Sequence, residues 1–276
     1  MKVVIFGAGG MLGTDIMNAF QSVPDFEVHG FASHEVDITN AQQVLETLHI
    51  QKPEVLVNCA AYTNVDAAEE DEELATRVNG YALHNVSEAC NQANTHLVHF
   101  STDYVFNGEN SEGYREDALT NPVNAYGRSK LAGEQEIQKY CQSYSIIRTS
   151  WLFGKNGKNF VDTIQHLLGE KDEITVVDDQ KGSPTFTEDL AEAVSTLLQS
   201  GPPSGKNIYH RTNSGVCTWF EFAEEIRSII GSASRVLPCS TEEFPRTARR
   251  PKCSILLNTK LPHLSGWKEA LKDYLK

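Results

Sequence analysis

The chain has 276 residues, and its 24 basic and 37 acidic side chains give a formal charge of −13 at pH 7. A field of this sign repels polyanions, which argues against nucleic acid and anionic membrane surfaces as partners. A hydrophobic fraction of 40% and a charged fraction of 22% are typical of a folded globular protein rather than a disordered one. The length corresponds to about two domains.

The N-terminus leads directly into an apolar run, Val3–Phe6, without the basic region and cleavage site of a signal peptide. No apolar stretch approaches the length of about 18 residues that suggests a membrane span. The six cysteines are irregularly spaced and include no C-x-x-C pair. We therefore expect a cytoplasmic protein with reduced thiols. His96 and His99 fall at an odd offset in a strand-like run, which indicates structural roles on opposite faces and no zinc site.

Apolar runs alternate with helical patterns over the first half of the chain. The runs predicted as strands are residues 3–6, 26–31, 55–58, 96–100 and 144–148, and the predicted helices cover 14–22, 41–49 and 125–140. Steps of four between apolar residues also predict helix in the acidic segment 66–94. This alternation indicates an α/β fold, a Rossmann-like doubly wound parallel sheet over residues 1–151.

Residues 152–276 are less periodic. A strand is expected at 174–177, and helices are expected at 187–199 and 218–230. We interpret this part as a smaller C-terminal α/β domain, mainly substrate-binding, of which some segments can return to the first domain. It would complete a cleft above the carboxyl ends of the strands, where open α/β sheets bind ligands.

A glycine cluster follows the first predicted strand. The spacing G-x-x-G-x-x-G is met by Gly7, Gly10 and Gly13, with Met11 and Leu12 between the last two. Glycines at these positions allow a tight turn, close approach of a pyrophosphate to backbone N–H groups, and close packing of helix on sheet. The N-terminus of the following helix then receives the anion. No Lys-Ser or Lys-Thr follows, which disfavours a nucleoside-triphosphate loop and favours a dinucleotide.

The end of the second predicted strand bears on the choice of dinucleotide. An acidic residue there usually holds the adenosine ribose hydroxyls of NAD. Residues 30–34 contain no carboxylate, which favours NADPH over NADH without fixing it. Ser33 or His34 would lie near the extra phosphate, although His34 is equally consistent with a plain surface loop.

Tyr126 and Lys130 stand four residues apart in a predicted helix and therefore share one face. A nearby ammonium favours tyrosinate, so it can lower the phenol pKa from its usual value of about 10 and make the tyrosine a usable general acid or base. About 25 residues earlier, a strand ends at Ser101 and Thr102, which places a hydroxyl at the carboxyl edge of the sheet. A Tyr-x-x-x-Lys pair arises easily by chance, so its value depends on this setting.

Taken together, these motifs resemble the extended short-chain dehydrogenase/reductase superfamily, and within it most closely the dTDP-4-dehydrorhamnose reductases. The resemblance covers nearly the whole chain. It rests on the glycine cluster, Asp37-Ile38, 58–63, 101–106, the Tyr126/Lys130 pair, 148–154, 182–185, 219–223 and 250–252.

The resemblance implies reduction of the 4-keto group of dTDP-4-dehydro-β-L-rhamnose to dTDP-L-rhamnose with NADPH or NADH, for the synthesis of polysaccharide sugars. Under it, Tyr126 protonates the developing alkoxide, Lys130 holds the nicotinamide ribose, and Thr102 hydrogen-bonds the keto oxygen. Asp37 and Ile38 would flank the adenine. The residues that would line the cofactor are Ala60, Ala61, Tyr62 and Thr63, and those that would contact the sugar are Asp103 and Trp151. Trp151 could equally be a core aromatic residue, and Asp103 could merely orient a loop.

Some alternatives stay open from the sequence. Some members of this family bind Mg²⁺ between the subunits of a dimer, and Asp15 and Glu188 stand near the positions concerned, so Mg²⁺ and a homodimer are left undecided. The protein could be a non-catalytic NADP-binding regulatory subunit, although Thr102, Tyr126 and Lys130 are all present. It could also be another nucleotide-sugar epimerase, reductase or dehydratase, although the single acidic residue after Thr102 disfavours elimination.

Overall fold

The computed structural model describes all 276 residues and is built around one six-stranded parallel sheet. Its strand order is β10-β5-β4-β3-β1-β2, so the order reverses between β1 and β3. The strands are β1 (Lys2–Phe6), β2 (Glu27–Phe31), β3 (Val55–Asn58), β4 (His96–Thr102), β5 (Tyr144–Thr149) and β10 (Lys206–His210). The predicted α/β fold with a doubly wound parallel sheet is confirmed.

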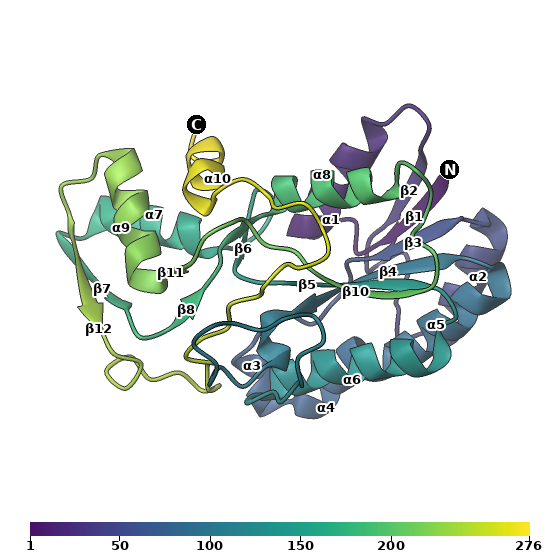
Figure 1. Cartoon of the computed structure of the whole chain (residues 1–276), viewed down its shortest axis with the longest axis horizontal. Helices are drawn as coiled ribbons and strands as arrows, with labels where there is room; N and C mark the ends of the chain where they lie inside the picture. The colour runs from purple at the N-terminus through teal and green to yellow at the C-terminus, as the bar shows by residue number, and fades with distance from the viewer.

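Helices cover both faces of this sheet, because its strands are apolar on both sides (Figure 1). One face packs against α2 (Ala41–Gln51), α5 (Ala82–Ala93) and α6 (Ala125–Tyr140). The other packs against α1 (Met11–Gln21) and α8 (Thr187–Leu198). Alternate residues of β1 serve the two cores: Val4 and Phe6 join the first, and Val3 and Ile5 the second.

A second, smaller lobe lies beyond the carboxyl ends of the strands (Figure 1). Its core contains Phe153, Phe186 and Phe222 packed together with Trp267. Its helices are α7 (Phe160–Glu170), α9 (Trp219–Ile230) and α10 (Trp267–Tyr274). Its short strands are β6 (Leu152–Phe153), β7 (Glu173–Val177), β8 (Lys181–Gly182), β9 (Thr185–Phe186), β11 (Cys217–Thr218) and β12 (Arg235–Cys239).

The chain crosses between the two lobes more than once. After β5 it enters the smaller lobe, yet α8 packs against α1, and β10 pairs in parallel with β5 at the edge of the large sheet. The predicted boundary near residue 151 therefore marks only the first crossing. No helix is both long and apolar enough to cross a bilayer.

The segment predicted as helical over 66–94 is divided in the structure. It contains α3 (Ala67–Glu70), α4 (Glu72–Thr76), a π-helical turn at Arg77–Tyr81, and α5. Asp71 ends the first helix in a non-helical conformation, and its carboxylate caps the second by accepting from Leu74 N at 2.9 Å. Within the π turn, Asn79 binds both the N–H and the carbonyl of Tyr62, at 2.8 and 2.9 Å. The irregular turn thus holds the loop that follows β3.

Candidate active site

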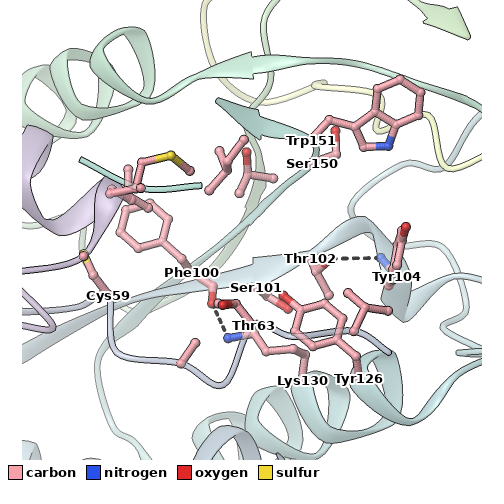
Figure 2. Close-up of a pocket in the computed structure, with 18 of the residues that line it drawn as sticks. Cys59, Thr63, Phe100, Ser101, Thr102, Tyr104, Tyr126, Lys130, Ser150 and Trp151 are labelled. Atoms are coloured by element: carbon pink, nitrogen blue, oxygen red, sulfur yellow. Dashed lines mark hydrogen bonds between the residues drawn. The ribbon is translucent and has the colours of Figure 1, made fainter. Parts of the chain in front are cut away.

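A cavity of about 670 Å³ opens at the carboxyl ends of β1, β3 and β4, beside the N-terminal turns of α6. This is the point at which the strand order reverses, where open α/β sheets bind ligands. In Figure 2, Tyr126 and Lys130 lie on the α6 side of the cavity, and Ser150 and Trp151 lie on the opposite side.

Most of the predicted site residues line this cavity. From the predicted cofactor set these are Gly10, Met11, Leu12, Gly13, Ala60, Ala61, Thr63 and Lys130. From the predicted catalytic and sugar-binding sets these are Thr102, Asp103, Tyr126, Lys130 and Trp151. Four predicted residues lie outside the lining, namely Gly7, Asp37, Ile38 and Tyr62. Asp37 accepts hydrogen bonds from Thr39, and Ile38 is buried in the core beside α2.

The glycine turn is shaped by very close backbone packing. Gly7 has a φ of +74°, and a Cβ there would lie 2.6 Å from Ala60 N. A Cβ on Gly13 would lie 2.1 Å from Gly7 O, so α1 approaches the turn more closely than any other residue type allows. Gly10 is the N-cap of α1 and brings no side chain to cap it, which leaves the helix N-terminus free to receive an anion.

We expect Gly13→Ala to destabilise the fold by roughly 1–3 kcal/mol or more, because the new methyl group would collide with rigid backbone. Urea unfolding followed by circular dichroism measures this change. Gly169→Ala is the matched control, since nothing apart from the adjoining backbone of α7 lies within 4 Å of its Cβ position. The control should stabilise the protein by up to about 1 kcal/mol. Equal stability of the two variants would contradict the close packing of α1 on the turn.

The last residue of β4 and the residue after it bring a hydroxyl and a carboxylate to the cavity. Thr102 Oγ1 donates to Asp103 Oδ1 at 3.0 Å and accepts from Tyr104 N at 3.2 Å, the second bond being drawn in Figure 2. Burial raises the pKa of Asp103 to about 7. Asp103 Oδ2 and Thr149 Oγ1 are buried without a hydrogen-bond partner, and both residues line the cavity. Buried polar atoms without partners at a cavity wall are open to a ligand.

The start of α6 fixes the position of Tyr126. Asn124 caps the helix by accepting from Gly127 N at 2.7 Å, and its amide donates to Arg249 O at 2.8 Å. Gly127 packs so closely that a Cβ would lie 2.2 Å from Tyr104 O. The Tyr104 and Tyr126 rings meet edge to face, with centroids 6.0 Å apart.

The pKa of the Tyr126 phenol is raised in the structure, whereas the sequence analysis expected Lys130 to lower it. Burial and the nearby Asp103 carboxyl raise its pKa above the usual value, whereas an interaction with Thr102 lowers it to a smaller extent. The lysine was expected to lower this pKa, but loss of hydration dominates in the free protein. The phenol is therefore protonated at neutral pH, the form that a proton donor needs.

Lys130 is buried on the same face of α6. Its Nζ donates to Phe100 O at 2.7 Å, as drawn in Figure 2, and lies 3.2 Å from His99 Nε2. Burial lowers the pKa of Lys130 to about 8. Amine and ammonium are therefore both accessible near neutral pH.

On the opposite wall, Trp151 stacks on Trp219, with ring centroids 3.5 Å apart and an angle of 9° between the planes. Trp151 has a φ of +48°, which is rare for a bulky residue. Gly182 makes the arrangement possible, because a Cβ there would lie 2.6 Å from the Trp151 indole. Such backbone strain is found at functional sites more often than elsewhere.

Comparison with known proteins supports the family resemblance that the sequence motifs indicated. A sequence model of the family described as "RmlD substrate binding domain" matches residues 1–276. The spore coat polysaccharide biosynthesis protein SpsK of Bacillus subtilis is 38% identical over 100% of this chain and 97% of that protein. The dTDP-4-dehydrorhamnose reductase of Escherichia coli is 33% identical over 100% and 97%. The crystal structure of dTDP-4-dehydrorhamnose reductase from Bacillus anthracis in complex with NADP is 40% identical, with a TM-score of 0.94 over 99% of this chain and 98% of that one.

The chain belongs to the dTDP-4-dehydrorhamnose reductase family. The resemblance seen in the sequence is thereby confirmed.

The structure also places in the cavity lining several residues that the sequence analysis did not predict as site residues. Thr149, Ser150 and Trp219 line the cavity, and so does the loop Asn156–Lys158, which brings a cation to its mouth. Thr149 ends β5 as Thr102 ends β4, and Ser150 comes directly after it, so their position at a strand end was an available signal. The loop 156–158 carried no such signal, because its approach to Met11 depends on how the two lobes pack.

The two carboxylates considered for Mg²⁺ lie close together between α1 and α8. Asp15 is buried with Oδ2 unpartnered, and burial together with the charge of Glu188 raises its pKa. Glu188 pairs with Lys155 at 3.2 Å. The chain holds no group of three or more His, Cys, Asp or Glu side chains suited to a metal ion. The steps proposed below involve no metal ion.

Proposed function

We propose that this protein reduces the 4-keto group of dTDP-4-dehydro-β-L-rhamnose with NADPH and forms dTDP-L-rhamnose. The observation that carries the proposal is the convergence of Thr102, Tyr126 and Lys130 on one wall of the cavity, beside the glycine turn that ends at Gly13. Membership of the reductase family supports the same reaction. The proposed partners are thus a dinucleotide and a dTDP-sugar, both anionic small molecules.

The half of the cavity nearest α1 is the proposed cofactor site. The free N-terminus of α1 at Gly10 suits the pyrophosphate, and Lys130 lies deeper, where it would hold the nicotinamide ribose. NADPH is proposed over NADH because residues 30–34, at the end of β2 and directly after it, carry no carboxylate, and the Bacillus anthracis relative was crystallised with NADP. The bound reduced cofactor supplies the hydride to the keto carbon.

Side chains of the protein would donate a proton and a hydrogen bond to the ketone oxygen. As negative charge develops there, the Tyr126 phenol donates its proton, and the Thr102 hydroxyl donates a hydrogen bond. Thr102 now donates to Asp103, so it would exchange that bond for one to the substrate. The neutral phenol is already the form required, because burial keeps the pKa of Tyr126 high.

The unpartnered polar atoms on the cavity wall would recognise the sugar. Asp103 Oδ2 and Thr149 Oγ1 can accept from ring hydroxyls and would lose their unsatisfied state on binding. The stacked indoles of Trp151 and Trp219 offer the apolar surface that carbohydrate and base faces require.

Incubation with NADPH and enzymatically prepared dTDP-4-keto-6-deoxyglucose, together with its 3,5-epimerase, tests the proposal. We expect absorbance at the reduced-cofactor band to fall only when the sugar is present. An arm without the epimerase shows which sugar epimer is reduced, and an NADH arm measures cofactor preference. No oxidation with any nucleotide 4-ketosugar would refute the reductase and favour a non-catalytic NADP-binding subunit.

A further inference from the structure

A buried histidine faces the catalytic lysine from the neighbouring strand. His99 lies in β4, three residues before Thr102, and is almost fully buried. Its Nε2 atom is 3.2 Å from Lys130 Nζ, while Lys130 Nζ donates its other bond to Phe100 O. The arrangement raises the question of which of the two nitrogens, Nε2 or Nζ, is the donor.

A second contact answers that question. Asn58 Oδ1 accepts from Ala60 N at 3.2 Å, and a backbone N–H can only donate, so the orientation of the Asn58 amide is fixed. Its Nδ2 then faces His99 Nδ1 at 3.1 Å. Because an amide nitrogen donates and never accepts, His99 Nδ1 must carry a lone pair. A neutral imidazole has one N–H, which is therefore on Nε2.

We propose that Asn58 locks His99 in the Nε2–H tautomer, and that this N–H, aimed at Lys130 Nζ, favours the amine form of the catalytic lysine. An amine has a lone pair to accept from Nε2–H, whereas an ammonium would set two donors face to face. His99 and Asn58 are thus positioning residues that act through Lys130. Their catalytic consequence rests on the proposed reductase function, but the tautomer itself does not.

The other groups around this contact do not supply a competing acceptor. The Glu134 carboxylate, one turn further along α6, is bound by Arg148 at 2.7 Å and by Ser101 at 2.5 Å. The Cys59 thiol is protonated, since burial raises its pKa. Tyr126 is likewise neutral at rest. His99 stays neutral because burial lowers its pKa well below the usual value.

The contact between His99 and Lys130 would assist the reprotonation of Tyr126 after each turnover. After Tyr126 gives its proton to the substrate, the ammonium form of Lys130 can return one, which leaves a phenol and an amine. His99 Nε2–H then stabilises that amine until a solvent proton restores the ammonium. The pKa of Lys130, lowered to about 8 by burial, keeps both forms within reach during turnover.

Asn58→Asp tests the lock with almost no change of shape. A carboxylate can still accept from Ala60 N, but it must accept from His99 Nδ1 as well, which moves the imidazole proton to Nδ1 and turns Nε2 into an acceptor for ammonium. We expect ¹⁵N NMR of the folded full-length protein to show the Nε2–H tautomer of His99 in the wild type and the Nδ1–H tautomer in the variant.

A second NMR measurement follows the protonation of Lys130 independently of the His99 tautomer. The ¹³Cε signal of Lys130, assigned by its loss in Lys130→Met, should titrate at least about one pH unit higher in Asn58→Asp, a tenfold change in the ratio of the two forms. The alkaline limb of kcat should move in the same direction. His96 is an internal control, because its ring contacts Ser143 and Ser145 and its ¹⁵N signals should not change.

Each outcome decides the proposal. A wild-type His99 with its proton on Nδ1 overturns it, and this holds even if Asn58→Asp does not fold. A higher lysine midpoint with His99 still in the Nε2–H form also overturns tautomer control, since added negative charge alone would explain it. Both NMR measurements need no substrate, so failure of the reductase proposal would leave them interpretable.

Discussion

Tyr126→Phe is expected to lower kcat for ketone reduction by a factor of about 10²–10⁴ while leaving NADPH affinity nearly unchanged. The substitution removes only the phenolic oxygen, which donates the proton to the developing alkoxide. The phenyl ring keeps its edge-to-face packing on Tyr104 at the start of α6, so the helix and Lys130 stay in place. Stopped-flow measurement of NADPH oxidation and fluorescence titration of NADPH report the two quantities independently.

Tyr114→Phe is the matched control for loss of a phenol. Tyr114 is buried outside the cavity, and its hydroxyl donates to Asn107 at 2.7 Å. This variant should keep full activity and lose only a little stability. Full turnover by Tyr126→Phe would instead assign the proton donor to another group, with Thr102 and Asp103 the nearest candidates.

Glu134→Gln is expected to destabilise the protein by about 3–5 kcal/mol, because it leaves the Arg148 guanidinium buried without its counter-charge. The Glu134 carboxylate is fully buried, and Arg148 is almost so. Arg148 donates from Nε and Nη2 to the two carboxylate oxygens at 2.9 and 2.7 Å, and Ser101 also donates to the carboxylate. The cluster joins α6 to the ends of β4 and β5, so it holds the helix that carries Tyr126.

Chemical unfolding of Glu134→Gln beside Glu72→Gln measures this contribution. Arg128, which lies in α6 like Glu134, makes an equally short bidentate ion pair with Glu72 of α4, with both N–O distances 2.7 Å. Both of these side chains are more than 40% exposed. Loss of this ion pair should cost about 1 kcal/mol or less. If the two variants were equally stable, burial of the Glu134 pair would not be what ties α6 to the sheet. Replacing Glu134 and Arg148 together by apolar residues should recover part of the stability.

Local spacing made part of the site predictable. The three glycines, the Tyr126/Lys130 pair and the strand end at Thr102 each lie within one short segment, where backbone geometry alone sets the relation between neighbouring side chains. The parallel order of the strands then places the ends of β1, β3 and β4 at one edge of the sheet, which explains why most of the predicted residues line one cavity.

Other features depend on which segments meet across the fold. Trp219 reaches the cavity only because it stacks on Trp151 at the start of α9. Strand β10 pairs with β5 of the large sheet, although the chain passes through the smaller lobe between these two strands. The odd offset of His96 and His99 placed them on opposite faces, but it could not show that His99 meets Lys130. The division of segment 66–94 was likewise hidden, because Asn79 leaves regular helix to bind Tyr62, a residue 17 positions earlier.

The sequence by itself determined the α/β class, the glycine turn, the strand-end hydroxyl and the Tyr-Lys pair, since these follow from periodicity and from residue types at short range. Only the tertiary structure decided the protonation of the groups. The Tyr126 phenol has a raised pKa, not a lowered one, and the Lys130 ammonium is destabilised. The physical reason is that loss of water and the orientation of buried partners govern charge, and both arise only when distant segments pack together.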